Sequence, residues 1–377
     1  MPELEEIIDF INPDEKLLRK GRERQSAVWK GIEPDYLPLI LQETEAPELN
    51  NFVHYTLKDQ FFNKEKMILE QLKGLVGFAK AGGDAQFSIR ANLGVGVVPS
   101  IFGLKPIFTQ DDQMPWFVRM DPFGKGTLSK EEVQNLDIPG DIRNRGLIPT
   151  AIEYIEYFKS KIKNGVNIYC FDTQGPFDIA HLIRGPQIYT DLYDDPEFVH
   201  RLMDISTRVY IETTKIFKEA AGEPLCSGYH GSLCLYMDGG GVRLCDDSST
   251  NLSPHLFREF SLPYIKRALS PFGGGWIHFC GNSNHLLDMY LEVEEIKGLN
   301  FGNPEKYDYE SIMTKMISKG KFYLGVWPGK KGESLKEYFQ RILAPLKGRK
   351  CGLILQFSRE KNELPCSEII DLWYSLQ

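Results

Sequence analysis

The sequence predicts an α/β protein, a (β/α)8 TIM-like barrel with an N-terminal helical extension. Eight short apolar segments bounded by Gly, Pro or Asn read as strands, and most are separated by segments of helical periodicity. Polar residues also gather directly after these segments, where the active site of such a barrel lies. An open doubly wound sheet with an extra helical region is the alternative. The predicted strands lie at about 36–41, 87–93, 167–172, 241–246, 274–280, 295–301, 321–327 and 351–357.

The first part of the chain is predicted to be mainly helical. Residues 1–33 form the extension as two helices, and Asp14 is placed to cap the second. Residues 47–81 carry apolar side chains at helical spacing, and Gly82-Gly83 ends that run. Residues 104–146, rich in Pro, Gly and Asp, form a long loop excursion. We expect residues 1–377 to be a single domain.

Helices and strands alternate in the second part of the chain. The helix at about 254–270 begins after Ser253, a good cap, with Pro254 in its first turn. It leads into the strand that contains Trp276. Residues 226–237 precede the fourth strand. Further helices are expected at about 147–163, 195–221, 308–319, 334–346 and 366–376.

The composition narrows the class of protein. A net charge of −8 without a block rich in Lys and Arg argues against a nucleic-acid surface. No stretch reaches the roughly 18 consecutive apolar residues that a membrane span needs. The seven cysteines are odd in number and widely spaced, which favours a reduced, cytoplasmic protein over a disulfide framework. A homodimer is left open.

A candidate metal site lies in the strand at 274–280. His278 and Cys280 are two positions apart, so in a strand they point to the same face. An imidazole and a thiolate side by side supply two ligands of a tetrahedral zinc site. The third ligand stays open: Cys245 and Asp247 share a face at the end of the neighbouring strand, and Glu360 can reach over from the eighth strand.

Further polar residues at the strand ends are candidates for catalysis and substrate binding. We expect Asp246, Asp247 and Arg90 to orient the substrate and Asn282 to support His278. The alternative for such residues is turn or cap chemistry, in which Asn, Asp and Ser take part. The candidate substrate-binding residues are Asn92, Asp172, Gln174, His181, Trp327 and Arg359.

Three segments together resemble the uroporphyrinogen decarboxylase-like superfamily. They are Gln174-Gly-Pro-Phe177, the stretch from Cys245-Asp-Asp-Ser248 to Lys266, and Ile277-His-Phe-Cys-Gly-Asn282. The resemblance implies a (β/α)8 barrel with a cleft at the carboxyl ends of its strands. The true decarboxylases of this superfamily carry an N-terminal Arg-Gln-Ala-Gly-Arg segment, whereas this chain has Arg19-Lys-Gly-Arg-Glu-Arg24.

The resemblance is closer to the zinc-dependent methyltransferases of the superfamily. In that branch His-x-Cys supplies two zinc ligands, which implies His278 and Cys280 here. Its third ligand is a cysteine at the end of strand eight, where this chain has Phe357 and Ser358. The implied activity is methyl transfer between a small molecule and a corrinoid protein or a thiol, with Zn²⁺ as cofactor. A metal-free decarboxylase-like lyase and a non-catalytic ligand-binding barrel are the alternatives.

Overall fold

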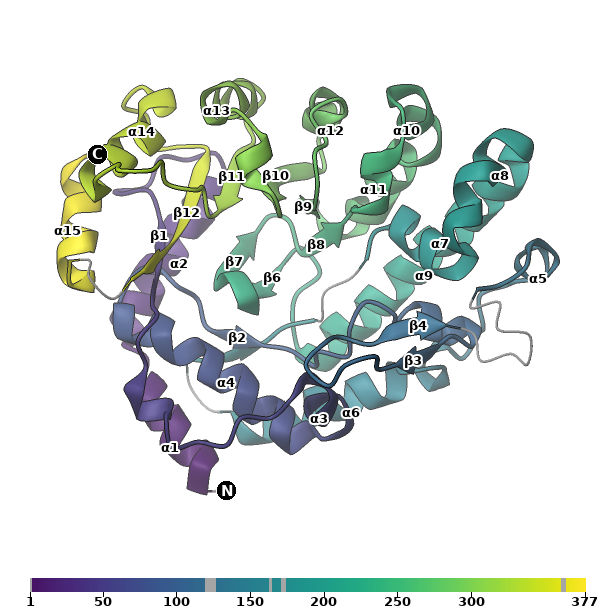
Figure 1. Ribbon diagram of the computed structural model, residues 1–377, viewed down its shortest axis with the longest axis horizontal. Coiled ribbons are helices and arrows are strands. Elements are labelled where there is room, and N and C mark those ends of the chain that lie inside the picture. Colours follow the sequence, from purple (N-terminus) through teal and green to yellow (C-terminus); the bar gives the residue numbers. More distant parts are fainter. Residues whose placement is uncertain (1, 119–126, 163–164, 171–173, 361–363) are drawn as a thin grey trace.

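The computed structural model describes residues 2–118, 127–162, 165–170, 174–360 and 364–377. Its helices surround a set of parallel strands (Figure 1). Six strands form one sheet in the order β1-β12-β11-β10-β9-β8, and β2 and β5 form a separate parallel pair. The strands are β1 (Leu39–Glu43), β2 (Ser88–Ile89), β5 (Asn167–Ile168), β8 (Val242–Cys245), β9 (Gly275–Phe279), β10 (Ile296–Phe301), β11 (Phe322–Gly325) and β12 (Leu353–Arg359).

Hydrogen bonds join the β2–β5 pair to both edges of the six-stranded sheet. Beyond β5, Gln174 forms a parallel bridge with Cys245, whose carbonyl accepts the Gly175 N–H at 2.7 Å. Just before β2, the Asp84 N–H donates to the Leu39 carbonyl at 2.8 Å, and the Asp84 carboxylate accepts the Leu39 N–H at 2.9 Å. All eight predicted strands are therefore present, in chain order, in a parallel α/β arrangement consistent with a (β/α)8 barrel.

The helices cover the outer face of these strands, which explains why the strands read as apolar runs on both faces. Asp14 and Ser253 begin helices as predicted, because their side chains accept backbone N–H groups of the first turn. Gly82 ends a helix as predicted, with φ 72°. The helices are α1 (Pro2–Ile11), α2 (Glu15–Trp29), α3 (Leu57–Phe62), α4 (Lys64–Ala81), α5 (Lys130–Gln134), α6 (Ile148–Lys161), α7 (Pro176–Arg184), α8 (Ile188–Asp194), α9 (Pro196–Ala221), α10 (Pro254–Phe260), α11 (Leu262–Leu269), α12 (Leu287–Glu292), α13 (Tyr309–Ser318), α14 (Leu335–Leu343) and α15 (Cys366–Ser375).

Two segments have more regular structure than the sequence predicted. The excursion 104–146 contains an antiparallel hairpin, β3 (Lys105–Ile107) and β4 (Trp116–Val118), followed by α5. Ser129 begins α5 with a capping box. The segment before β8 is also a hairpin, β6 (Ser227–His230) and β7 (Leu235–Asp238).

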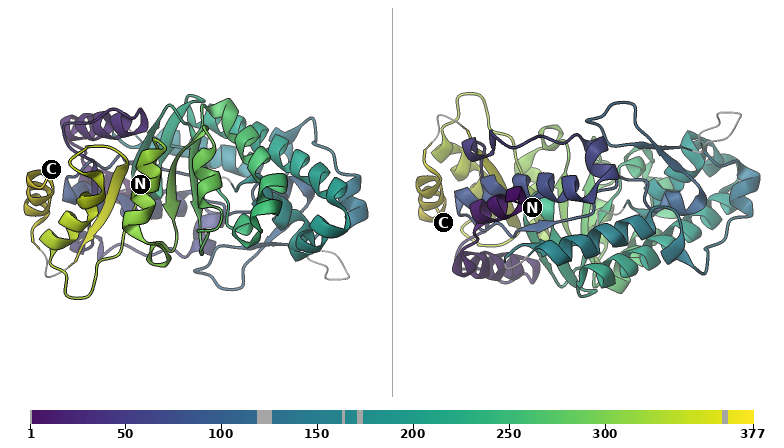
Figure 2. Two further views of the ribbon diagram at one scale, coloured as in Figure 1. Left: turned by 90° about the horizontal axis from the view of Figure 1, so that it is seen from above. Right: turned by 90° about the horizontal axis from the view of Figure 1, so that it is seen from below.

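The amino ends of the strands are covered by α2 and the β6–β7 hairpin. Gln25 of α2 is fully buried, accepts the Tyr236 N–H at 2.7 Å and donates to the Cys234 carbonyl at 3.3 Å. Trp29 packs on Phe322 at the start of β11, with ring centroids 4.8 Å apart. Figure 2 shows α2 (purple) and the β3–β4 hairpin (blue) on opposite sides of the strands. The carboxyl ends of the strands therefore form the other end, where a site is expected.

A buried ionic cluster ties both ends of the chain to β1. Arg24 of α2 is 5% exposed and pairs with Asp84 at 2.9 Å and with Asp35 at 2.8 Å. Tyr374 of α15 also accepts from this guanidinium. Burial raises the pKa of Asp84, and the charge of Arg24 opposes that shift.

Among the described residues, every helix is too short or too polar to cross a bilayer.

Candidate metal centre

Strand register brings the predicted metal ligands together with residues of the neighbouring strands. Cys245 of β8 lies opposite His278 of β9, and His278 lies opposite Asn300 of β10. Paired residues of adjacent parallel strands point to the same face of a sheet. The opposite face carries Asp246, which bonds to Tyr290 of α12, so these three side chains point away from the surrounding helices.

Three side chains, those of Cys245, Asp247 and His278, converge at the carboxyl ends of β8 and β9, and Cys280 lies beside His278. The potential ligand atoms of Cys245, Asp247 and His278 all lie within 4.8 Å of one another. The Cys245 thiol donates to Asp247 Oδ2 at 3.3 Å, and Cys280 Sγ lies 3.6 Å from His278 Nε2. Asp247 Oδ1 accepts the backbone N–H of Cys280 at 2.6 Å. Two sulfurs, an imidazole nitrogen and a carboxylate oxygen are a ligand set that suits zinc.

Asn300 fixes the tautomer of His278. The Asn300 amide group donates to the Leu324 carbonyl at 2.7 Å, so its oxygen faces His278 Nδ1 at 2.6 Å. That oxygen accepts only, so Nδ1 carries the proton and Nε2 presents its lone pair. Gly325 permits this contact, because a Cβ there would lie 2.3 Å from Asn300 Nδ2. Nε2, the nitrogen beside Cys280, is therefore prepared to bind a cation.

Replacing Asn300 with Ala is expected to weaken zinc binding by about 10- to 100-fold, since partners that orient a ligating histidine contribute roughly that much. Competition with a chromophoric chelator measures the affinity. Asn251→Ala is the matched control, because this exposed amide bonds to Tyr189 and Ser248, outside the group. Equal zinc affinity in Asn300→Ala and the wild type would show that His278 needs no such support.

Desolvation favours the protonated form of both thiols, the buried Cys245 and the more exposed Cys280, in the absence of a cation. It raises the pKa of the Cys245 thiol well above its ordinary value. Burial, followed by the nearby Asp247 charge, also raises the pKa of Cys280. Gly302 makes room for Cys280, because a Cβ at that position would lie 2.6 Å from Sγ. A divalent cation would favour the thiolates and release these protons.

Asp178, in the first turn of α7, holds the loop that carries Asp247. Its two oxygens accept the backbone N–H groups of Asp247 at 3.1 Å and of Ser248 at 2.7 Å. Burial, then the charges of Asp246 and Asp247, raises the pKa of Asp178. Reduced ionisation of Asp178 lowers the repulsion within this group of carboxyls.

Comparison with known proteins was made against families, curated proteins and solved structures. A model of uroporphyrinogen decarboxylase (URO-D) matches residues 22–228, more than half of the chain. The chain belongs to the URO-D family. No curated protein matches it. A methyltransferase from Methanosarcina mazei is similar in structure, with a TM-score of 0.66 at 18% sequence identity, over 94% of this chain and 97% of that chain. This likeness supports the fold.

The family match ends before β8, so the four-residue group lies beyond it. Sequence reasoning found His278, Cys280 and Asp247 and left Cys245 as one option for the third ligand. It missed Asn300. The sequence holds a signal for Asn300, because it is a polar residue within a strand that was predicted to neighbour the strand of His278.

Two predicted roles at the metal group are corrected by the structure. Asn282 does not support His278: it is exposed, and its side-chain oxygen accepts the Asn284 N–H at 3.0 Å in a local turn. Glu360 is exposed and lines a separate depression of about 330 Å³ with Val326 and Trp327, outside the Cys245-Asp247-His278 group. The residues nearest to His278 and Cys280 therefore come from β8 and β10.

Two other predicted residues, Asp246 and Arg359, lie on the outer face of the sheet, where each is bonded to another side chain. Asp246 is fully buried there, because alternation along β8 turns it away from Cys245 and Asp247, and it accepts the Tyr290 hydroxyl at 2.6 Å. Arg359 pairs with Glu43 at 2.7 Å. These positions contradict the predicted roles of Asp246 and Arg359 in contacting substrate.

Trp327 also lies in this outer layer. It is 5% exposed, and the centroid of its ring lies 4.7 Å from that of Tyr309 and 5.3 Å from that of Tyr323. Its ring therefore serves the packing of this layer, and because Trp327 also lines the depression that contains Glu360, its role in binding substrate stays a prediction.

The remaining predicted residues differ in where the structure places them. His181 lies on α7 beside Ser248, with Nδ1 3.2 Å from its hydroxyl, and Gln174 is buried in the bridge to β8. Asp172 lies outside the described residues. Arg90 and Asn92 line a polar cavity of about 360 Å³.

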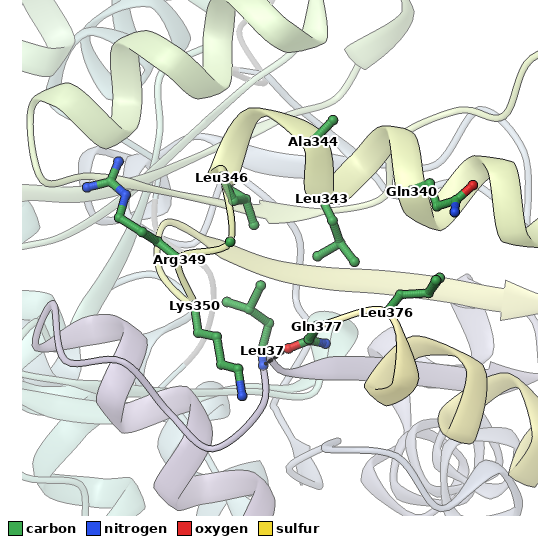
Figure 3. Close-up of a pocket in the computed structure, with 10 residues that line it drawn as sticks. Leu37, Gln340, Leu343, Ala344, Leu346, Arg349, Lys350, Leu376 and Gln377 are labelled. Carbon is green, nitrogen blue, oxygen red and sulfur yellow. Dashed lines mark hydrogen bonds between the residues drawn. The ribbon is translucent and has the colours of Figure 1, made fainter.

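A second cavity, of about 250 Å³, lies away from the metal group (Figure 3). Leu37 before β1, Leu343 at the end of α14, Lys350 before β12 and Leu376 after α15 help to line it. It therefore borders the amino ends of β1 and β12, whereas Cys245, His278 and Cys280 lie at the carboxyl ends of β8 and β9.

Proposed function

We propose that this chain is a zinc-dependent methyltransferase whose eight parallel strands close into a single (β/α)8 barrel domain. It moves a methyl group between a small molecule and a corrinoid protein or a thiol. The observation that carries the proposal is the Cys245, Asp247 and His278 group at the carboxyl ends of two adjacent strands, with Cys280 Sγ 3.6 Å from His278 Nε2. The name of the structural neighbour, a methyltransferase, agrees with it.

The side chains of this group suit zinc chemically, and the hydrogen bond from His278 to Asn300 holds the imidazole in the tautomer that can bind it. Thiolate, imidazole and carboxylate are the protein ligands that zinc ordinarily takes, and a catalytic site keeps one position for substrate. We assign Cys245, His278 and Cys280 as the ligands, with His278 binding through Nε2. Zinc, when bound, lowers the pKa of a thiol that joins it and keeps the nucleophilic thiolate available at neutral pH.

Asp247 is assigned to proton transfer. Its Oδ2 accepts a hydrogen bond from the Cys245 thiol, whose proton would leave to solvent on metal binding. Once Cys245 is a thiolate, that oxygen can accept the proton of an incoming substrate thiol. The new sulfur–carbon bond then forms as the bond between the methyl carbon and its donor breaks, and the donor keeps the bonding electron pair. Asp178 keeps Asp247 in place for this step through the two N–H groups it binds.

The proposal is tested with free methylcobalamin as methyl donor and 2-mercaptoethanol as acceptor. We expect about one zinc per chain in protein purified without added metal, and formation of the methyl thioether, detected by mass spectrometry, that stops when zinc is removed. The decarboxylase alternative is tested by anaerobic incubation with uroporphyrinogen. Absence of zinc together with release of CO₂ would replace the methyltransferase by the lyase. Absence of zinc and of both reactions would favour a binding protein.

A further inference from the structure

The chain turns away from the sheet directly after Cys280. The ladder between β9 and β10 ends where the Gly302 N–H donates to the Phe279 carbonyl at 2.9 Å. Gly281 then adopts φ 87°, in the left-handed region that favours glycine, and the chain leaves the plane of the strands. The N–H groups of Cys280 and Gly281 therefore need acceptors other than the carbonyls of the ladder.

Side chains that follow the two neighbouring strands supply these acceptors. Asp247, after β8, accepts the Cys280 N–H through Oδ1 at 2.6 Å. Asn303, after β10, accepts the Gly281 N–H through Oδ1 at 2.9 Å. The Asn303 amide group donates to Glu305 Oε1 at 3.0 Å, so its oxygen faces Gly281. The turn is therefore held from both sides.

Tyr307 holds the far end of the same turn. Its hydroxyl accepts the Ser283 N–H at 2.7 Å and donates to the Gly281 carbonyl at 3.3 Å. Its ring stacks on Phe301 of β10, with centroids 4.2 Å apart. Tyr307 and Ser283 are both buried, and a hydrogen bond inside a protein is electrostatically stronger than one in water. We call Asn303 and Tyr307 together the turn clamp.

The start of this turn sets the position of the Cys280 thiol. Cys280 Sγ lies 3.6 Å from His278 Nε2. A sulfur about 2.3 Å and a nitrogen about 2.0–2.1 Å from one zinc ion are about 3.5–3.6 Å apart in tetrahedral geometry. The two atoms are thus already at the separation that a shared zinc ion requires. Metal binding then needs little movement of the turn.

We infer that the turn clamp positions the Cys280 thiol for metal binding, at its separation of 3.6 Å from His278 Nε2. The inference rests on the proposed function for the role of the metal, whereas the hold on the turn needs no metal. Asn303 acts through the Gly281 N–H, and Tyr307 acts through the carbonyl of the same glycine. Loss of either contact weakens binding, because the thiol then has to be ordered when the metal binds.

Titration of the metal-free protein with Co²⁺, which binds sites of the same ligand types, tests the inference. Charge-transfer absorption from thiolate to cobalt follows the titration and shows that the ion is bound to sulfur. Asn303→Ala is expected to bind Co²⁺ about 10- to 100-fold more weakly, the range for partners that orient a metal ligand. Asn303→Asp keeps an oxygen that accepts the Gly281 N–H and is expected to restore most of the affinity. Equal Co²⁺ affinity in Asn303→Ala and the wild type would overturn the inference.

Tyr307→Phe tests the other half of the clamp, because it removes the hydroxyl and keeps the ring that stacks on Phe301. We expect the Co²⁺ affinity to fall about 10-fold. Tyr309→Phe is the matched control, since the Tyr309 hydroxyl donates to the Ile342 carbonyl at 2.8 Å in a buried contact away from the turn. Both variants lose buried hydrogen bonds and are expected to melt at a lower temperature. Equal Co²⁺ affinity in these two variants would overturn the role of Tyr307.

Alkylation of the metal-free protein separates this inference from the proposed function. The rate at which iodoacetamide modifies Cys280 is measured by peptide mass spectrometry, with the exposed Cys226 as internal reference. We expect Asn303→Ala to raise the Cys280 rate severalfold and to leave the Cys226 rate unchanged. Metal binding by the wild type with equal affinity in every clamp variant would leave the metal site standing and remove the role of the clamp. A wild type that binds neither Zn²⁺ nor Co²⁺, with a raised Cys280 rate in Asn303→Ala, would remove the proposed function and leave the hold on the turn.

Discussion

Cys280→Ser is expected to lose stoichiometric zinc and to lower methyl transfer by more than about 100-fold. Partners that only orient a zinc ligand contribute about 10–100-fold, so loss of a ligand itself costs more. Serine has nearly the same size as cysteine, but its hydroxyl does not ionise at neutral pH and is a poor zinc ligand. Zinc is measured by elemental analysis of the purified protein, and activity with methylcobalamin and 2-mercaptoethanol.

Cys226→Ser is the matched control for this variant. Cys226 is exposed, precedes β6 and belongs to the hairpin at the amino ends of the strands, away from His278. We expect Cys226→Ser to keep its zinc and its activity. Full zinc content in Cys280→Ser, or equal loss in both variants, would contradict the assignment of Cys280 as a ligand.

Arg24→Met is expected to destabilise the protein by about 3–5 kcal/mol, the range found when one partner of a buried ion pair is removed. The variant leaves Asp84 buried, at 3% exposed, without the charge that offsets its desolvation. Asp84 also accepts the Leu39 N–H at the start of β1, so the loss weakens the join between β1 and β2. The shift of the urea midpoint at constant slope measures the effect.

Asp35→Asn is the control for Arg24→Met. Asp35 binds the same guanidinium but is 49% exposed, so solvent screens the pair and we expect a loss below about 1 kcal/mol. A loss in Arg24→Met as small as that in Asp35→Asn would show that the buried pair with Asp84 does not hold these elements together. Zinc content should be equal in the folded forms of both variants.

The fold was predictable because its strands are covered on both faces. Strand β11, Phe-Tyr-Leu-Gly, and the Leu-Ile-Leu start of β12 are therefore apolar runs that a sequence reveals without knowledge of their neighbours. The hairpin β3–β4 was not predictable, because two strands of three residues carry too little periodicity. Helix α12 was also missed, and it has only six residues.

The site was predictable only as far as residues close in sequence determine it. His278 and Cys280 share a face by alternation within one strand, so the sequence reveals them. The alignment of Asn300 with His278 depends on the register between strands, which alternation within a strand does not define. Asn282 was assigned wrongly because the chain turns at Gly281, where φ is 87°, and carries Asn282 away from the interior.

X-ray diffraction at the zinc absorption edge, on crystals of the protein purified without added metal, tests the metal assignment most directly. We expect one anomalous peak per chain, about 2.0–2.1 Å from His278 Nε2 and about 2.3 Å from the sulfurs of Cys245 and Cys280. A chain without a peak, or with its peak at Glu360 or any other place away from His278 and Cys280, would contradict the zinc-dependent function.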